Sequence, residues 1–260
     1  MQSSVEKVDP SRIITAYSGV YIARTDQYAT VMTHFPGTNA TGGPWSTRGR
    51  FKASIDLFVH GEKVVEIFSN ETNQDGIVKL DIDDYFGLYP EDSCAFGILK
   101  YEHPADVPVA GYFSLVHKKT GSYAPVSVLQ FIGDEVFTEW HSRVLETALF
   151  WPGLASHRDL LETIIIMNPY TSSFLFQLHL YVNGSEKSQS QVMKIQPKCV
   201  QEFVIEDLFK NEWADVLDAK GGASLCVSAQ YKVLTLMKLT QKNTGIITGI
   251  DHLHPYGLIG

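Results

Sequence analysis

The sequence lacks the features that mark exported, membrane-spanning and nucleotide-dependent proteins. It begins Met-Gln-Ser-Ser-Val-Glu-Lys, without the basic start and apolar stretch of a secretory signal. Its longest apolar runs, such as 163–167 and 148–151, are far too short to cross a bilayer. Glycine-rich phosphate-binding motifs, HExxH and CxxC are all absent. We therefore expect a cytoplasmic protein with no membrane span, and we predict no cofactor.

Cysteines and charged residues are scarce. Cys94, Cys199 and Cys226 show no paired spacing, which favours free thiols in a reducing compartment. Charged residues make up 19% of the 260 residues, and the net charge is −8 with no basic stripe. Because a nucleic-acid-binding protein needs clustered Lys and Arg to neutralise phosphates, we predict no nucleic-acid partner. The 44% hydrophobic content instead indicates well-formed cores.

Hydrophobicity with a period of two residues is abundant. Residues 51–59 alternate apolar and polar side chains, and a turn at His60-Gly61 leads into a second such run, which predicts a β-hairpin. Further strands are expected downstream, including one at 126–131, separated by turns that contain Pro or Gly. Short strands at this spacing predict an all-β protein made of β-sandwiches with about seven strands each.

The second half of the chain repeats the order of the first. Three blocks recur at an offset of 123 or 124 residues: 55–61 with 178–184, 80–86 with 203–209, and 118–121 with 242–245. Two copies of one domain explain this better than a solenoid, which needs three or more short repeats.

The repeat predicts two tandem, internally duplicated β-sandwich domains. The first is expected at 12–133 and the second at 162–255. The remaining ranges are an N-terminal tail at 1–11, a connector at 134–161 and a C-terminal tail at 256–260.

Two segments break the repeat and carry aromatic residues. One is the Gly- and Thr-rich stretch 37–49 around Trp45, and the other is the connector, with Trp140, His141 and Trp151. Loops at the ends of a sandwich can present such rings to a ligand or partner, so these four residues are the predicted binding residues. The alternative is that the tryptophans pack between the two domains.

The C-terminal stretch Asp251-His252-Leu253-His254 is the candidate metal site. On a single strand, His252 and His254 would share a face and could both bind a metal ion. A complete site needs further ligands, for which the sequence shows no fixed spacing, and an exposed chain end is the alternative. His141 and Ser142 would point to opposite faces of a strand, so we predict no catalytic residues and no enzyme.

One part of the second half has a family resemblance. A strand ending in Asn168, a paired strand, a turn with Pro197 and a strand closing at 202–208 follow one another. This order, mainly over residues 162–208, resembles the small β-sandwich proteins of the sensory-rhodopsin transducer family. The resemblance implies a non-enzymatic, oligomeric and cytoplasmic protein that binds a partner or small ligand. The duplication departs from that family, so its oligomer geometry is not carried over.

These observations predict a non-catalytic binding or assembly protein. It would recognise a protein partner or a small ligand through the loops and edges of two β-sandwiches. Because edge strands leave backbone groups unpaired, we also expect a homo-oligomer or a larger complex. Two alternatives stay open: a metal-dependent enzyme that uses His252 and His254, and a glycan-binding module.

Overall fold

The computed structural model describes residues 13–23, 27–36, 52–69, 78–81, 95–104, 109–126, 129–132, 147–154, 158–185, 188–219, 222–229 and 233–255. These residues form eighteen strands and two short helices. The predicted all-β fold is therefore confirmed. None of the helices in these segments is long and apolar enough to cross a membrane.

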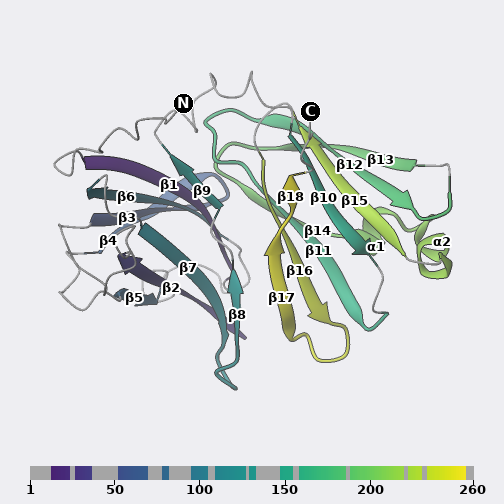
Figure 1. Cartoon of the computed structure of the whole chain (residues 1–260), viewed down its shortest axis with the longest axis horizontal. Coiled ribbons are helices and arrows are strands. Elements are labelled where there is room, and N and C mark those ends of the chain that lie inside the picture. Colours follow the sequence, from purple (N-terminus) through teal and green to yellow (C-terminus); the bar gives the residue numbers. More distant parts are fainter. Residues whose placement is uncertain are drawn as a thin grey trace, which may run out of the picture.

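The first nine strands form two antiparallel sheets (Figure 1). Sheet A has the order β4-β3-β6-β1-β9 and sheet B the order β5-β2-β7-β8. Their bounds are β1 (Ile13–Ile22), β2 (Tyr28–Pro36), β3 (Lys52–Val59), β4 (Glu62–Ser69), β5 (Val78–Asp81), β6 (Ala95–Pro104), β7 (Val109–His117), β8 (Tyr123–Val126) and β9 (Leu129–Ile132).

The second nine strands form two further sheets. Sheet C has the order β13-β12-β15-β10-β18 and sheet D the order β14-β11-β16-β17. Their bounds are β10 (Thr147–Leu154), β11 (Leu160–Met167), β12 (Phe174–Val182), β13 (Ser188–Ile195), β14 (Val200–Val204), β15 (Ala223–Ala229), β16 (Leu234–Gln241), β17 (Ile247–His252) and β18 (His254–Pro255). The two helices, α1 (Ile205–Leu208) and α2 (Trp213–Asp218), lie between β14 and β15.

The strand order of the second half matches that of the first. Adding nine to each label in sheets A and B gives the order of sheets C and D. Such a match is what an internal duplication would produce, and the duplication itself stays a prediction. The described residues of each half form nine strands rather than about seven. One reason is that the strand expected at 126–131 is split between β8 in sheet B and β9 in sheet A.

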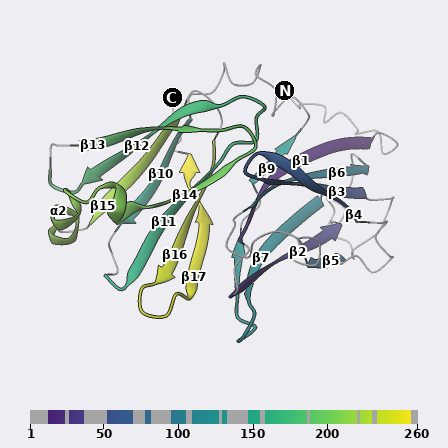
Figure 2. The same ribbon diagram turned by 180° about the vertical axis from the view of Figure 1, so that it is seen from behind.

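Sheet D lies between sheet C and the first half, as both views show (Figures 1 and 2). Its central strand β11 is buried on both faces. Ile164 and Ile166 belong to the core of the second half, whereas Ile165 and Met167 join the core of the first. The apolar run Ile164–Met167 does not alternate, as expected of a strand with no solvent-facing side.

The range predicted as a connector contains strands of the second half. β10 and the first two residues of β11 lie within 134–161, and β10 pairs with β15 in sheet C. The apolar stretch Ala148–Trp151 hides this strand in the sequence, because consecutive apolar residues mask a period of two. The sheets of the second half therefore include residues from 147 onward, within the range predicted as a connector.

Candidate functional site

The predicted binding residues fall in different places. Trp45, Trp140 and His141 lie outside the described residues. Trp151 lies on β10, and its partly buried side chain packs against the core of the second half. Trp151 thus packs within the second half and not between the two halves, which was the predicted alternative, and a binding role for it stays a prediction.

The predicted metal pair does not share a strand. His252 ends β17 and pairs with Leu236 in sheet D, whereas His254 belongs to β18 and pairs with Phe150 in sheet C. The chain passes from one sheet to the other at the buried Leu253. The shared-face argument therefore does not hold. No group of three or more metal-ligating side chains was found in the described part of the chain, and a metal at these histidines stays a prediction.

The residues on the outer face of sheet C follow from the alternation and register of its strands. Alternation along β12 directs Phe176, Leu178 and Leu180 into the core and leaves the residues between them on the outside. Register across the sheet then gives this face as Ser188, Ser190, Val192 and Lys194 on β13; Leu175, Gln177, His179 and Tyr181 on β12; Ser224, Cys226 and Ser228 on β15; and Ala148, Phe150 and Pro152 on β10.

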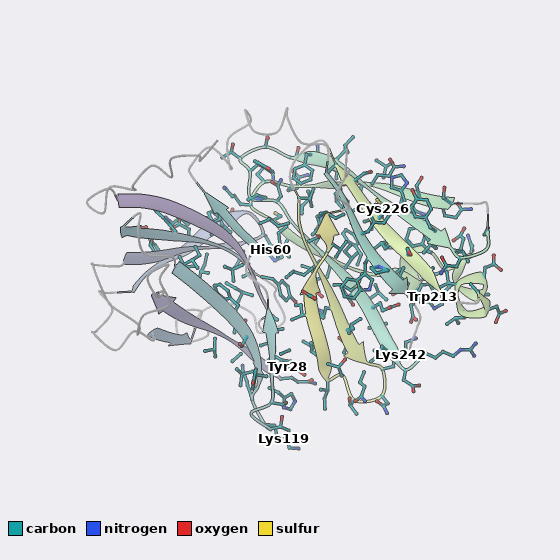
Figure 3. All side chains as sticks on the ribbon, viewed as in Figure 1. Tyr28, His60, Lys119, Trp213, Cys226 and Lys242 are labelled. Atoms are coloured by element: carbon teal, nitrogen blue, oxygen red, sulfur yellow. The ribbon has the colours of Figure 1, made fainter. Side chains whose placement is uncertain are left out.

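Three rings gather over the small residues of β15. The Tyr181 ring lies 6.3 Å from that of His179 and 6.5 Å from that of Phe150, with interplanar angles of 24° and 25°. Phe150 and His179 both lie opposite Cys226, labelled in Figure 3, so the larger side chains flank a thiol that is itself buried. Burial raises the pKa of that thiol, which keeps it protonated and unreactive.

Apart from Lys194, the polar groups at the register positions of this face are neutral. The His179 Nε2 and Ser228 Oγ atoms are 3.0 Å apart and hydrogen bonded. No Asp or Glu occupies any register position of the face on β13, β12, β15 or β10, and its single cation, Lys194, lies opposite Leu175 at the end away from Tyr181. At the described register positions of this face, no carboxylate lies beside the Ser–His pair as the third member of a hydrolytic triad would.

Strand β13 is one of the two edge strands of sheet C, and in the described part of the chain it pairs on one side only, with β12. Six of its eight residues are exposed, and Lys194 is its one charged residue. The neighbouring apolar side chains are exposed as well, 59% for Leu175 and 63% for Val192. Figure 1 shows β13 beside β12 in the second half.

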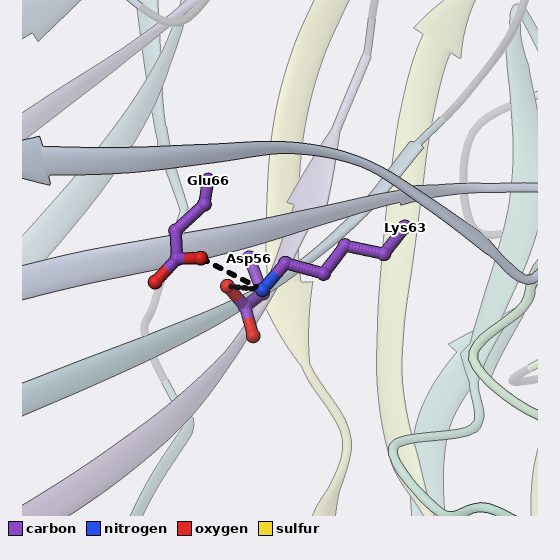
Figure 4. Close-up of polar contacts among 3 residues, drawn as sticks. All are labelled: Asp56, Lys63 and Glu66. Atoms are coloured by element: carbon purple, nitrogen blue, oxygen red, sulfur yellow. Dashed lines mark hydrogen bonds and ion pairs between the residues drawn. The ribbon is translucent and has the colours of Figure 1, made fainter.

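In the first half, the positions that correspond to His179 and its neighbours on β13 carry charged side chains that form ion pairs. Asp56 lies directly opposite Glu66 on the outer face of sheet A, and the Lys63 Nζ atom is 2.7 Å from Asp56 and 3.0 Å from Glu66 (Figure 4). The hydrogen bond to Asp56 contributes most to raising the pKa of Lys63. At the same register positions the second half has His179 opposite Ser190.

Phe58 of β3 is the first-half counterpart of Tyr181, and its ring is contacted by a residue of the second half. The Lys198 Nζ atom lies 5.7 Å from the centre of the Phe58 ring and donates a hydrogen bond to the Pro169 carbonyl oxygen. Burial lowers the pKa of Lys198 to about 8. Beside it, the turn at His60-Gly61 packs against Pro197, with no room for a side chain at Gly61. Residues that correspond in the two halves are thus covered in one and exposed in the other.

Two polar contacts also join the halves. The Ile247 N–H donates to the Tyr28 hydroxyl over 2.7 Å, and the Tyr28 ring meets His117 edge-on at 5.1 Å. On the other side, Glu202 accepts hydrogen bonds from the Tyr21 hydroxyl and from Lys238. Tyr28 and Tyr21 are both buried, so these contacts fix the halves against each other.

Comparisons with known proteins do not place the chain in a family. No protein-family model matches the chain, and no characterised protein matches its sequence. Among solved structures, a calcium-binding mutant of Bacteroides uniformis β-glucuronidase 2 aligns at a TM-score of 0.21 and 7% identity, over 94% of this chain and 26% of the other. The apo form of Pleurotus ostreatus lectin aligns at 0.21 and 10% identity, over 91% and 76%. Scores this low support no argument about fold or function.

Part of the outer face of sheet C can be predicted from the sequence. Alternation over Phe174–Val182 identifies the outward side chains Gln177, His179 and Tyr181. It does not show that Phe150, on a strand two places away in the sheet, brings its ring beside Tyr181.

Proposed function

We propose that this chain is a non-catalytic assembly protein that pairs through the β13 edge with the same edge of a second copy. The observation that carries the proposal is the exposed strand β13, which ends a five-stranded sheet and has Lys194 as its one charge. Unpaired N–H and C=O groups along such an edge can accept another strand.

The corresponding edge of the first half supports this choice. Strand β4 carries Glu62, Lys63 and Glu66, charges of the kind that discourage pairing between edges. Strand β13 has Ser188, Ser190 and Val192 facing outward instead. The contrast leaves β13 as the edge of the two that favours association.

Paired copies would also bury apolar surface. Leu175 and Val192 lie on adjacent strands on the same face, next to the edge. Burial of exposed aliphatic side chains adds a favourable term to the backbone hydrogen bonds of a new strand pair. Assembly of this kind needs no catalytic group.

Light scattering after size-exclusion chromatography tests the proposal. The wild-type protein is expected to have at least the mass of a dimer at micromolar concentration, and Ser190→Lys/Val192→Lys is expected to be monomeric because like charges would face each other. Glu62→Lys, on the charged β4 edge, is the matched control and should keep the wild-type mass. A wild-type protein that stays monomeric at high concentration refutes the proposal, as does equal behaviour of the double variant and the control.

A further inference from the structure

A different feature of sheet C concerns a ligand rather than strand pairing. We propose that the end of the outer face formed by Phe150, His179 and Tyr181 binds a neutral carbohydrate. The site would stack the apolar face of a sugar ring on Tyr181 and hydrogen bond its hydroxyls through the polar side chains beside the rings.

The aromatic geometry supports the stacking. Tyr181 is 42% exposed, and its ring plane is within 25° of those of both His179 and Phe150. Ring centres more than 6 Å apart are too distant for the rings to cover one another face to face, so they lie offset. The exposed part of the Tyr181 ring is the surface on which the C–H groups of a pyranose would stack.

The polar groups beside the rings match a polyhydroxylated ligand. His179 and Ser228 are already hydrogen bonded, at 3.0 Å, and each retains capacity for a further bond. Gln177 lies two residues before His179 on the same face and brings an amide with both donors and acceptors. Groups of this kind bind hydroxyls without selecting for charge.

The absence of acidic groups at the register positions of this face argues for a neutral ligand. The protein has a net charge of −8, and the matched position of the first half holds the Asp56–Lys63–Glu66 ion cluster. In the second half the same positions carry His179 and serines. Among the described register positions of this face on β13, β12, β15 and β10, the one Lys or Arg is Lys194, at the end of β12 and β13 away from Tyr181.

The internal comparison also argues that the exposure of Tyr181 is not a general property of the fold. Phe58, its counterpart, is met by Lys198 of the second half. No atom lies within 4 Å of a side chain added at Gly184, whereas Gly61 meets Pro197. The Phe58 ring is therefore contacted by the other half of the chain, whereas the matching Tyr181 ring is exposed.

Isothermal titration calorimetry with defined probes tests the inference. The probes are neutral hexasaccharides of glucose, xylose, mannose and galactose, an alginate hexasaccharide as a charged comparison, and a decamer of proline as a competing stacking ligand. At least one neutral hexasaccharide should bind, whereas alginate and oligoproline should not. Tyr181→Ala should weaken that binding by about tenfold, and Tyr181→Phe should retain it because the ring is kept.

The matched control is Tyr123→Ala, which removes a tyrosine that is 71% exposed on β8 of the first half. It should bind like the wild type. No binding of any neutral hexasaccharide, preferential binding of alginate or oligoproline, or equal losses in the two alanine variants would each overturn the inference. Because assembly is read from molecular mass, failure of glycan binding leaves the proposal for β13 standing, and the reverse also holds.

Discussion

Phe58 and Tyr181 occupy matched positions on the second strand of two sheets with the same strand order, yet among the described residues only the Phe58 ring is met by the other half of the chain. Lys198 lies over Phe58, whereas Tyr181 is 42% exposed. The contact between the halves therefore uses a surface in the first sandwich whose equivalent in the second is left open. That asymmetry underlies both proposals and the first of the predictions below.

Gly61→Ala is expected to destabilise the protein by about 2 kcal/mol more than Gly184→Ala. Both glycines have a left-handed backbone, with φ of 87° and 82°, so alanine costs about 1 kcal/mol at either position. At Gly61 the added carbon would also lie 2.8 Å from the Pro197 carbonyl oxygen. Chemical unfolding of both variants measures the difference, and equal losses would show that this contact does not hold the halves together.

Tyr28→Phe should lower the free energy of unfolding by about 1–3 kcal/mol. The substitution removes the hydroxyl that accepts the Ile247 N–H and leaves a part-buried backbone donor unpaired. Tyr123→Phe, on an exposed ring, is the control and should change stability by less than about 0.5 kcal/mol. Urea titrations measure the free energy of unfolding of both variants. Equal values for Tyr28→Phe and its control would show that this hydrogen bond does not stabilise the protein.

Asn168→Ala should cost about 3 kcal/mol or more. The Asn168 side chain is fully buried; its amide donates to the Ser172 and Gln196 carbonyls over 2.9 Å, and its oxygen accepts from the Tyr170 N–H over 2.8 Å. Alanine would leave all three backbone groups without this partner. Asn211 is exposed, so Asn211→Ala is the control. Thermal unfolding measures both variants, and melting temperatures close to the wild type for both would contradict the role given to Asn168.

Lys198→Met should alter how stability depends on pH. Burial lowers the pKa of Lys198 from 10.5 to about 8, so between these values the unfolded chain binds more protons than the folded one. This group therefore makes stability rise with pH across that window, and its cost is greatest below pH 8. The wild type should gain stability relative to Lys198→Met between pH 7.5 and pH 10.

Melting temperatures at several pH values measure this gain. Lys119→Met, at an exposed lysine on the turn between β7 and β8 (Figure 3), is the control and should run parallel to the wild type. A difference between wild type and Lys198→Met that does not change with pH would remove the argument for a buried ammonium at this contact.

The sequence by itself determined the local structure of this protein. Alternation in Lys52–Val59 and Phe174–Val182 specifies strands and which side chains face the core, because neighbouring residues on a strand point to opposite faces. Glycine at position 61 specifies a tight turn, because its backbone takes the positive φ that other residues avoid. The repeated blocks predicted an internal duplication, which stays a prediction, and the described sheets of the two halves have the same order of strands.

Only the tertiary structure decided which strands adjoin and which faces are covered. The burial of β11 on both sides, the placing of Lys198 over Phe58 and the meeting of Phe150 with Tyr181 all join residues distant in the chain. Strand order sets these contacts, and a period of two carries no information about it. The separation of His252 from His254 has the same cause, since a change of sheet at Leu253 overrides the alternation that a single strand would impose.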